Sequence, residues 1–218
     1  DQPRSRGLGD VYKRQIEGSD KMQILKLLTR LRQLCLEPRL VYDNIDQPSS
    51  KLKACMELIK TMQENKQKVL LFSSFTSVLD LIAEECQKAG ITYYMLTGST
   101  NKEDRRELVS RFQKDDTTLF LISLKAGGTG LNLTSAEVVI HFDPWWNVSA
   151  QNQATDRAYR IGQKNNVQVF NLVMKDSVEE KIIELQKRKK ELADMFVENN
   201  SGGLSQMSKE DILSLFTM

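Results

Sequence analysis

The sequence is poor in the residues that build metal and disulfide sites. It has one histidine, His141, and three cysteines with no Cys-x-x-Cys pair, so we predict that the chain forms no metal site. The cysteines, Cys35, Cys55 and Cys86, are dispersed and odd in number, which favours reduced thiols in an intracellular protein. No apolar run is long enough to cross a bilayer, so we expect no membrane partner.

A strong charge of one sign is absent as well. The 31 lysines and arginines face 29 aspartates and glutamates, which gives a net charge of +2. Such a small excess permits nucleic-acid binding but does not argue for it. The 218 residues suit one domain with an appendage, so any function must be argued from local motifs.

A phosphate-binding loop is also missing. No Gly-x-x-x-x-Gly-Lys-Ser/Thr motif occurs, and no glycine is followed directly by lysine. Asp143 follows an apolar run as a magnesium-binding aspartate would, but Pro144 comes next and no nucleotide cradle accompanies it. We therefore expect this chain not to hold a nucleotide by itself.

Five short apolar runs alternate with helix-like stripes. The runs predict strands over residues 68–75, 91–96, 118–123, 137–142 and 167–173. Strands that are apolar on both faces and separated by helices are typical of an α/β domain with a mostly parallel sheet. Between the strands, Gly90 is placed to end one helix, and Thr100 with Glu103 predicts a capping box at the start of another.

Further helical stripes flank this domain. An apolar stripe over residues 24–35 predicts a helix that Pro38 ends, and a second stripe runs from Leu52 to Met62. Residues 178–197 predict a long helix docked on the domain. Residues 208–216 predict a short amphipathic helix, and residues 1–15 a flexible start.

Four of the predicted strands end in unusual loops. Because the carboxyl ends of parallel strands meet at one edge, we expect these loops to share a rim: Ser73–Ser74, LTGST (96–100), SLKAGGTGLNL (123–133) and DPWWN (143–147). Glycines and hydroxyls before a helix N-terminus suit a phosphate. Each loop alone is equally explained by turn glycines, a capped helix or core tryptophans. Their coincidence on one edge favours a phosphate-binding site.

The stretch QATDRAYRIGQ (153–163) follows the fourth loop. On one helix, Arg157 and Arg160 would share a face with Gln153. A salt bridge within the domain, for example to Asp156, readily explains one arginine. Two guanidinium groups beside such a rim favour phosphate recognition instead. Since no phosphate loop accompanies them, we predict that they act as arginine fingers on a nucleotide held by another domain.

Together these motifs resemble the C-terminal RecA-like (helicase C) lobe of the SWI/SNF-like DNA translocases in helicase superfamily two, from about Met22 to Phe196. KVLLFSSF resembles helicase motif four, and LTGST with Arg105 and Arg106 resembles the next motif. The segment from SLKAGG to DPWWN resembles motif five with its extension, and QATDRAYRIGQ resembles motif six. LKLLTRLRQLCLEP resembles the family's lead-in helix, and DSVEEKI the start of its brace segment. RIGQ and WWN are far more specific than generic helicase motifs.

The resemblance implies a RecA-like three-layer α/β sandwich with a mostly parallel sheet. Lead-in helices would occupy residues 20–66, the lobe residues 67–176 and a brace helix residues 177–200. Residues 1–19 do not match the family's pattern, and residues 201–218 would hold a short helix.

The resemblance also implies a function. The chain would be the C-terminal motor lobe of a DNA-dependent ATPase that translocates on double-stranded DNA and remodels or displaces bound proteins. ATP and Mg²⁺ would be held mainly by an absent N-terminal lobe, and the isolated chain would be inactive. Its partners would be that lobe, duplex DNA and, as an open option, RNA polymerase or another DNA-bound protein. Its compartment would be the cytoplasm or nucleoid of a bacterium or the nucleus of a eukaryote.

The resemblance assigns roles to particular residues. Arg157 and Arg160 would be catalytic, reaching the γ-phosphate, and Gln153, Gly128 and Gly130 would bind the nucleotide or couple the site. The DNA backbone would lie along Ser74, Gly98, Ser99, Arg105, Ser123, Lys125 and Trp146.

Two other functions stay open from the sequence. The C-terminal lobe of an RNA helicase would more often carry a glycine where Ala154–Asp156 runs, and it would lack RIGQ and WWN. A stand-alone docking module, for instance on RNA polymerase or on another ATPase, fits the missing phosphate loop.

Overall fold

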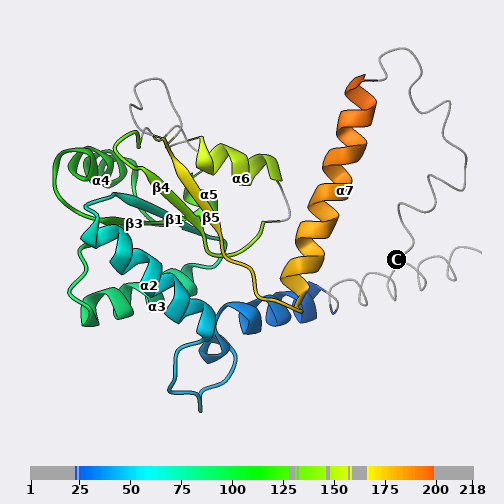
Figure 1. Ribbon diagram of the computed structural model, residues 1–218. Coiled ribbons are helices and arrows are strands. Elements are labelled where there is room, and N and C mark those ends of the chain that lie inside the picture. Colours follow the sequence, from blue (N-terminus) through cyan, green and yellow to red (C-terminus); the bar gives the residue numbers. More distant parts are fainter. Residues whose placement is uncertain are drawn as a thin grey trace, which may run out of the picture.

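The computed structural model describes residues 23, 25–127, 131, 133–145, 148–156, 158 and 166–198 (Figure 1). Its centre is a fully parallel sheet in the strand order β2-β3-β1-β4-β5. The strands are β1 (Val69–Ser73), β2 (Tyr93–Leu96), β3 (Leu119–Ser123), β4 (Val138–His141) and β5 (Gln168–Asn171). All five predicted strands are confirmed, and the sheet is wholly rather than mostly parallel.

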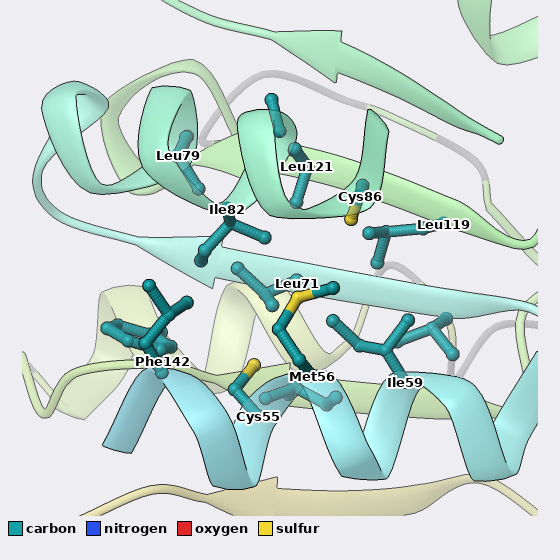
Figure 2. Close-up of a cluster of buried hydrophobic side chains, with 14 of the residues drawn as sticks. Cys55, Met56, Ile59, Leu71, Leu79, Ile82, Cys86, Leu119, Leu121 and Phe142 are labelled. Atoms are coloured by element: carbon teal, nitrogen blue, oxygen red, sulfur yellow. The ribbon is translucent and has the colours of Figure 1, made fainter. Parts of the chain in front are cut away.

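Helices cover both faces of this sheet. One core cluster joins the sheet to α2 (Ser50–Glu64) and α3 (Thr76–Lys88). The other joins it to α4 (Lys102–Lys114), α5 (Leu124–Gly127) and α6 (Val148–Thr155). Figure 2 shows the first cluster, in which Ile59 of α2 and Ile82 of α3 lie on either side of Leu71 of β1. The predicted three-layer α/β sandwich is confirmed.

The central strands are buried on both faces and the edge strands are not. Every residue of β1, β3 and β4 is buried, whereas β2 and β5 are mostly half-buried or exposed. Each fully buried leucine or phenylalanine side chain contributes about 1.5–3 kcal/mol to stability. Three of the four strands whose carboxyl ends carry the predicted rim, β1, β3 and β4, are therefore the most deeply buried strands of the sheet.

Helix α3 ends as the sequence predicts. Ala89 is its C-cap, and Gly90 follows with φ of +69°, a conformation that costs glycine little. The amide of Ile91 donates to the Cys86 carbonyl at 2.9 Å, and the amide of Gly90 to that of Gln87 at 3.2 Å. These two bonds form a Schellman motif, which satisfies carbonyls that the helix end leaves open.

The start of α4 differs from the prediction. Asn101, not Thr100, is the N-cap: its Oδ1 accepts from the amides of Glu103 at 3.0 Å and Asp104 at 2.8 Å. The hydroxyl of Thr100 instead accepts from the Thr97 amide at 3.1 Å and so tightens the preceding loop. The capping box of Thr100 with Glu103 is therefore wrong, because Thr100 is already engaged one turn earlier.

The helix over residues 25–36 is present, and it ends before Pro38, which opens the 3₁₀ turn Pro38–Leu40. The apolar stripe predicted over residues 24–35 is buried only in part. Leu27 and Leu31 are 60% and 40% exposed, while Arg32 and Leu36 are buried. Leu28, Leu34 and Cys35 of the predicted stripe are half-buried, so the prediction of an apolar stripe holds in part.

Helix α7 (Val178–Glu198) is anchored through its first turns. Lys51 Nζ of α2 contacts both carboxylate oxygens of Glu179 at 2.6 and 2.7 Å, and the Met174 amide donates to Glu179 Oε2 at 2.7 Å. Ile182 is also buried. Beyond these turns the helix runs away from the sheet (Figure 1), so the predicted docking holds for its beginning only. Within the described ranges, no helix has the length and apolarity needed to cross a membrane.

Candidate functional site

The carboxyl ends of four neighbouring strands lie along one edge of the sheet. The strand order places β2, β3, β1 and β4 side by side, and all pairs are parallel. The loops after these strands are the four that the sequence singles out. The predicted meeting of these four strand ends is therefore confirmed, while residues 128–130, 132, 146 and 147 of the loops lie outside the described residues.

An open cavity of about 510 Å³ lies at this rim. Its lining comes from the ends of β1, β2 and β3 and from the helices α3 and α5: Ser74, Thr76, Asp80, Thr97, Gly98, Ser99, Ser123 and Lys125. Five of these are among the residues that the sequence predicts along a DNA backbone: Ser74, Gly98, Ser99, Ser123 and Lys125. The fold thus brings together, in one hollow, side chains that lie more than one element apart in the sequence.

The loop after β2 presents hydroxyls and bare backbone. The hydroxyls of Thr97 and Ser99 are hydrogen-bonded to each other at 2.8 Å, a bond that uses only one of their two hydrogens. A Cβ built on Gly98 meets no atom within 4 Å. Because the fold does not require glycine at this position, the open space there is free for a ligand to approach the backbone.

The segment after β3 supplies a hydroxyl and the cationic group of the cavity. Ser123 Oγ accepts from the Ala126 amide at 3.3 Å, which holds its oxygen and leaves its own hydrogen to donate. Lys125 is exposed. Arg105 of α4 does not line the cavity: its Nη1 donates to the Ala126 carbonyl at 3.1 Å and supports this segment.

Asp143, at the end of β4, is a buried acceptor for several donors. Its Oδ1 accepts from Ser73 Oγ at 2.8 Å and from the Ser74 amide at 3.0 Å. Its Oδ2 accepts from Arg32 Nη2 at 2.8 Å and from the Ser74 hydroxyl. With a cation and three other donors around it, this carboxylate does not fit a magnesium ligand. No group of metal-ligating side chains occurs elsewhere among the described residues.

Helix α6 carries the start of the arginine motif. It ends at Thr155, and the amide of Ala158 donates to the Thr155 carbonyl in a turn at 3.0 Å. The described part of the predicted helix is α6, and whether one helix carries both arginines stays a prediction. Gln153 is exposed on α6. The predicted residues Arg157, Arg160, Gly128, Gly130 and Trp146 lie outside the described residues.

His141, the single histidine, joins β4 to α6. Its Nε2 lies 2.9 Å from Thr155 Oγ1, and its ring stacks on Phe72 with 5.6 Å between ring centres. Burial lowers the pKa of His141 to about 4. The ring is therefore neutral at neutral pH and serves as a structural link rather than a proton donor.

Trp145 is a core residue in part. Its ring is half-buried and packs against the core cluster on the α4–α6 face. Its carbonyl accepts from Gln186 of α7, and its amide donates to Gln151 of α6 at 3.2 Å. The segment after β4 is thus held by two helices that follow it in the chain.

Comparison with known proteins gives one consistent result. The family model described as the helicase conserved C-terminal domain matches residues 50–162. An ATP-dependent helicase of Mycoplasma pneumoniae is 38% identical over 217 residues, 99% of this chain and 21% of the relative. The ISWI chromatin-remodeling complex ATPase ISW1 of Saccharomyces cerevisiae is 35% identical over 213 residues, 89% of this chain and 19% of the relative.

A solved structure agrees with these relatives. The Sulfolobus solfataricus SWI2/SNF2 ATPase core in complex with dsDNA matches with a TM-score of 0.68 and 32% identity, over 89% of this chain and 42% of that one. The chain spans about a fifth of the length of the two curated relatives.

Proposed function

The chain belongs to the helicase conserved C-terminal domain family, and it shares the RecA-like fold of its relatives, which are SWI/SNF-type ATP-dependent helicases. From this we propose that it is the C-terminal motor lobe of a translocase on double-stranded DNA. The motor would remodel or displace proteins bound to the DNA. The observation that carries this proposal is the cavity at the strand ends, where five predicted DNA-contacting residues meet.

The chemistry of the cavity suits a phosphate backbone. Hydroxyls of Thr97, Ser99 and Ser123 and the ammonium group of Lys125 are donors, and Asp80 is the one carboxylate among the lining residues. Contacts of this kind position a duplex without reading its sequence. They suit a motor that must track any sequence, and they make binding salt-dependent. Arg105 would act here by holding the segment that carries Lys125. Trp146 would extend the DNA-binding surface beyond the cavity.

The nucleotide would sit between this lobe and another. The sequence has no phosphate loop, and Asp143 is engaged by protein donors, so ATP and Mg²⁺ are assigned mainly to an N-terminal lobe. Arg157 and Arg160 would reach the γ-phosphate from this lobe. Gln153, Gly128 and Gly130 would bind the nucleotide or couple its state to the DNA.

The division of the chain follows the same proposal. Residues 20–66 would lead into the lobe, residues 67–176 would form it, and residues 177–200 would brace it. The segments 1–19 and 201–218 lie outside the described residues. RNA polymerase or another DNA-bound protein would be the obstacle or partner, in the nucleoid of a bacterium or the nucleus of a eukaryote.

The test measures ATP turnover by this chain alone, with and without duplex DNA, and again after adding a separately produced N-terminal lobe that carries a phosphate loop. We expect no turnover by the chain alone and DNA-dependent turnover with the lobe. Stimulation by RNA instead of duplex DNA would replace the proposal by an RNA helicase. Failure of any lobe to restore turnover would favour a docking module.

The arginine fingers have their own test. Arg157→Ala or Arg160→Ala in the two-lobe protein is expected to reduce turnover by roughly 10³-fold or more while DNA binding and folding persist. Unchanged DNA-stimulated turnover in both variants would refute their role.

A further inference from the structure

A charged residue takes the buried position on the helix over residues 25–36. Arg32 is 8% exposed, whereas Leu27 and Leu31 on the same helix face solvent. Burying a guanidinium group is unfavourable unless its charge is paired and its N–H groups are hydrogen-bonded. The burial of Arg32 must therefore be compensated by its partners.

The hydrogen-bond partners of Arg32 come from two strand ends. Its Nη2 donates to Asp143 Oδ2 at 2.8 Å, to Ser74 Oγ at 2.9 Å and to the Pro144 carbonyl at 3.2 Å. Ser74 follows β1 and lines the cavity, and Asp143 and Pro144 follow β4. One side chain from outside the sheet thus joins two neighbouring loops of the rim.

Aromatic contacts hold the same guanidinium. Its central carbon lies 5.0 Å from the ring centre of Phe75 and 5.9 Å from that of Trp145. Phe75 comes directly after Ser74, and Trp145 directly before the predicted DNA-facing Trp146. A planar, delocalised cation suits contact with two rings at once, and a lysine at this position would have a shorter side chain and a compact charge.

Ser74 has no donor left for a phosphate in this arrangement. Its amide donates to Asp143 Oδ1, and its single hydroxyl hydrogen is donated to Asp143 Oδ2. Its hydroxyl oxygen accepts from Arg32. Ser74 nevertheless lines the cavity, so its contribution is the position of the β1 wall, which Asp143 and Arg32 set.

We propose that Arg32 is a positioning residue for DNA binding at this cavity. By fixing residues 73–75 against residues 143–145, it keeps the β1 wall at a set place beside the donors of Ser99 and Lys125. This inference rests on the proposed function of the cavity. Arg32 lies outside residues 50–162, so the DNA site extends beyond the matched domain into the preceding helix.

The experiment compares Arg32→Lys with the unchanged chain by NMR titration with duplex DNA at low ionic strength, where phosphate contacts are strongest. Lysine keeps the charge beside Asp143, so the fold is retained, but its shorter side chain weakens the contacts of Arg32 with Ser74, Pro144 and the two rings. We expect the dissociation constant to rise roughly tenfold, the size of one charge-assisted hydrogen bond. The DNA-induced shifts of Gly98 and Ser99 should shrink with it.

Glu179→Gln is the matched control. It breaks a second buried ion pair, Lys51–Glu179, whose contacts include no cavity residue. We expect its melting temperature to fall at least as far as that of Arg32→Lys, with unchanged DNA affinity. Equal losses of affinity in both variants would show general loosening and overturn the positioning role.

The two levels of the proposal fail differently. If Arg32→Lys binds DNA as the unchanged chain does, the positioning role is wrong and the DNA site stands. If the unchanged chain shows no DNA-induced shift at Gly98, Ser99 or Lys125, the proposed DNA site itself is wrong, and the role of Arg32 falls with it.

Discussion

Asp143 and Glu179 are each 1% exposed, and each holds a buried cation from a distant part of the chain. Asp143 binds Arg32 together with the hydroxyl and amide of Ser74, a residue of the cavity. Glu179 binds Lys51 and the Met174 amide, neither of which lines the cavity. Burial and pairing are alike at the two sites. The two sites differ in their neighbours. Asp143 contacts a residue of the proposed binding cavity, whereas Glu179 attaches helix α7 to the domain.

We expect the largest effect on stability from breaking the Lys51–Glu179 ion pair. Glu179→Ala leaves Lys51 buried without its partner, and burial already lowers the pKa of that lysine. We expect a loss of about 3–5 kcal/mol in the free energy of unfolding, measured by urea denaturation, because an uncompensated buried charge remains. The amides of the first turns of α7 should lose protection from hydrogen exchange.

DNA titration of Glu179→Ala completes this test. We expect its folded fraction to bind duplex DNA with unchanged affinity, unlike a variant at the Asp143 site. The double variant Lys51→Met with Glu179→Leu should recover much of the stability, since apolar side chains of similar size can replace a buried pair. A stability loss below about 1 kcal/mol in Glu179→Ala would mean that the pair is solvated.

The second effect concerns a buried group that is neutral rather than paired. Burial holds the pKa of His141 at about 4, below the ordinary value of 6.5. Between these values the unfolded chain binds a proton that the folded one does not, so stability falls as the pH drops from about 6.5 to about 4 and is flat below. The His141 contribution to this fall is on the order of 3 kcal/mol.

Comparison with His141→Gln isolates this contribution, because carboxylates also titrate in acid. The unfolding free energy of the variant should depend less on pH between 6.5 and 4 than that of the unchanged chain. Parallel curves for the two proteins would contradict a buried neutral ring.

Strands and helix ends are the features that the sequence predicts well. The five strands follow from apolar runs. Gly90 ends α3 because the Schellman motif needs a left-handed residue, here with φ of +69°, and glycine adopts that conformation at little cost. The sequence does not show that Asn101 rather than Thr100 is the N-cap of α4, since both residue types are good N-caps. It depends on the Thr97 amide, which has already engaged Thr100.

Long-range pairing is the part of the site that the sequence does not reveal. Strand ends predict which loops meet, so Gly98, Ser99, Ser123 and Lys125 are found without the structure. The partner of Arg32 lies 111 residues further on, and no periodicity links the two. The one local signal of a buried partner is that Arg32, a cation, lies within an apolar helical stripe, three residues before Cys35.

Two glycines sharpen the contrast between fold and binding surface. Gly90→Ala must keep a left-handed backbone, so we expect a loss of about 1 kcal/mol in unfolding free energy and unchanged DNA affinity. Gly98→Ala meets open space, so stability should be unchanged while the added methyl group hinders the approach of a DNA backbone. Denaturation and NMR titration of the two variants check both halves. Equal DNA affinity in Gly98→Ala and the unchanged chain would place the DNA elsewhere.

The smallest effect tests the charge on the rim. Lys125 lines the cavity and is exposed, so Lys125→Ala should leave stability unchanged. If its ammonium group neutralises one phosphate, the slope of log affinity against log salt should fall by about one. Lys60→Ala is the control, because Lys60 is also exposed, lies on α2 and does not line the cavity. The same salt slope in both variants would mean that DNA does not reach the β3 end of the rim, and would confine the site to the loops after β1 and β2.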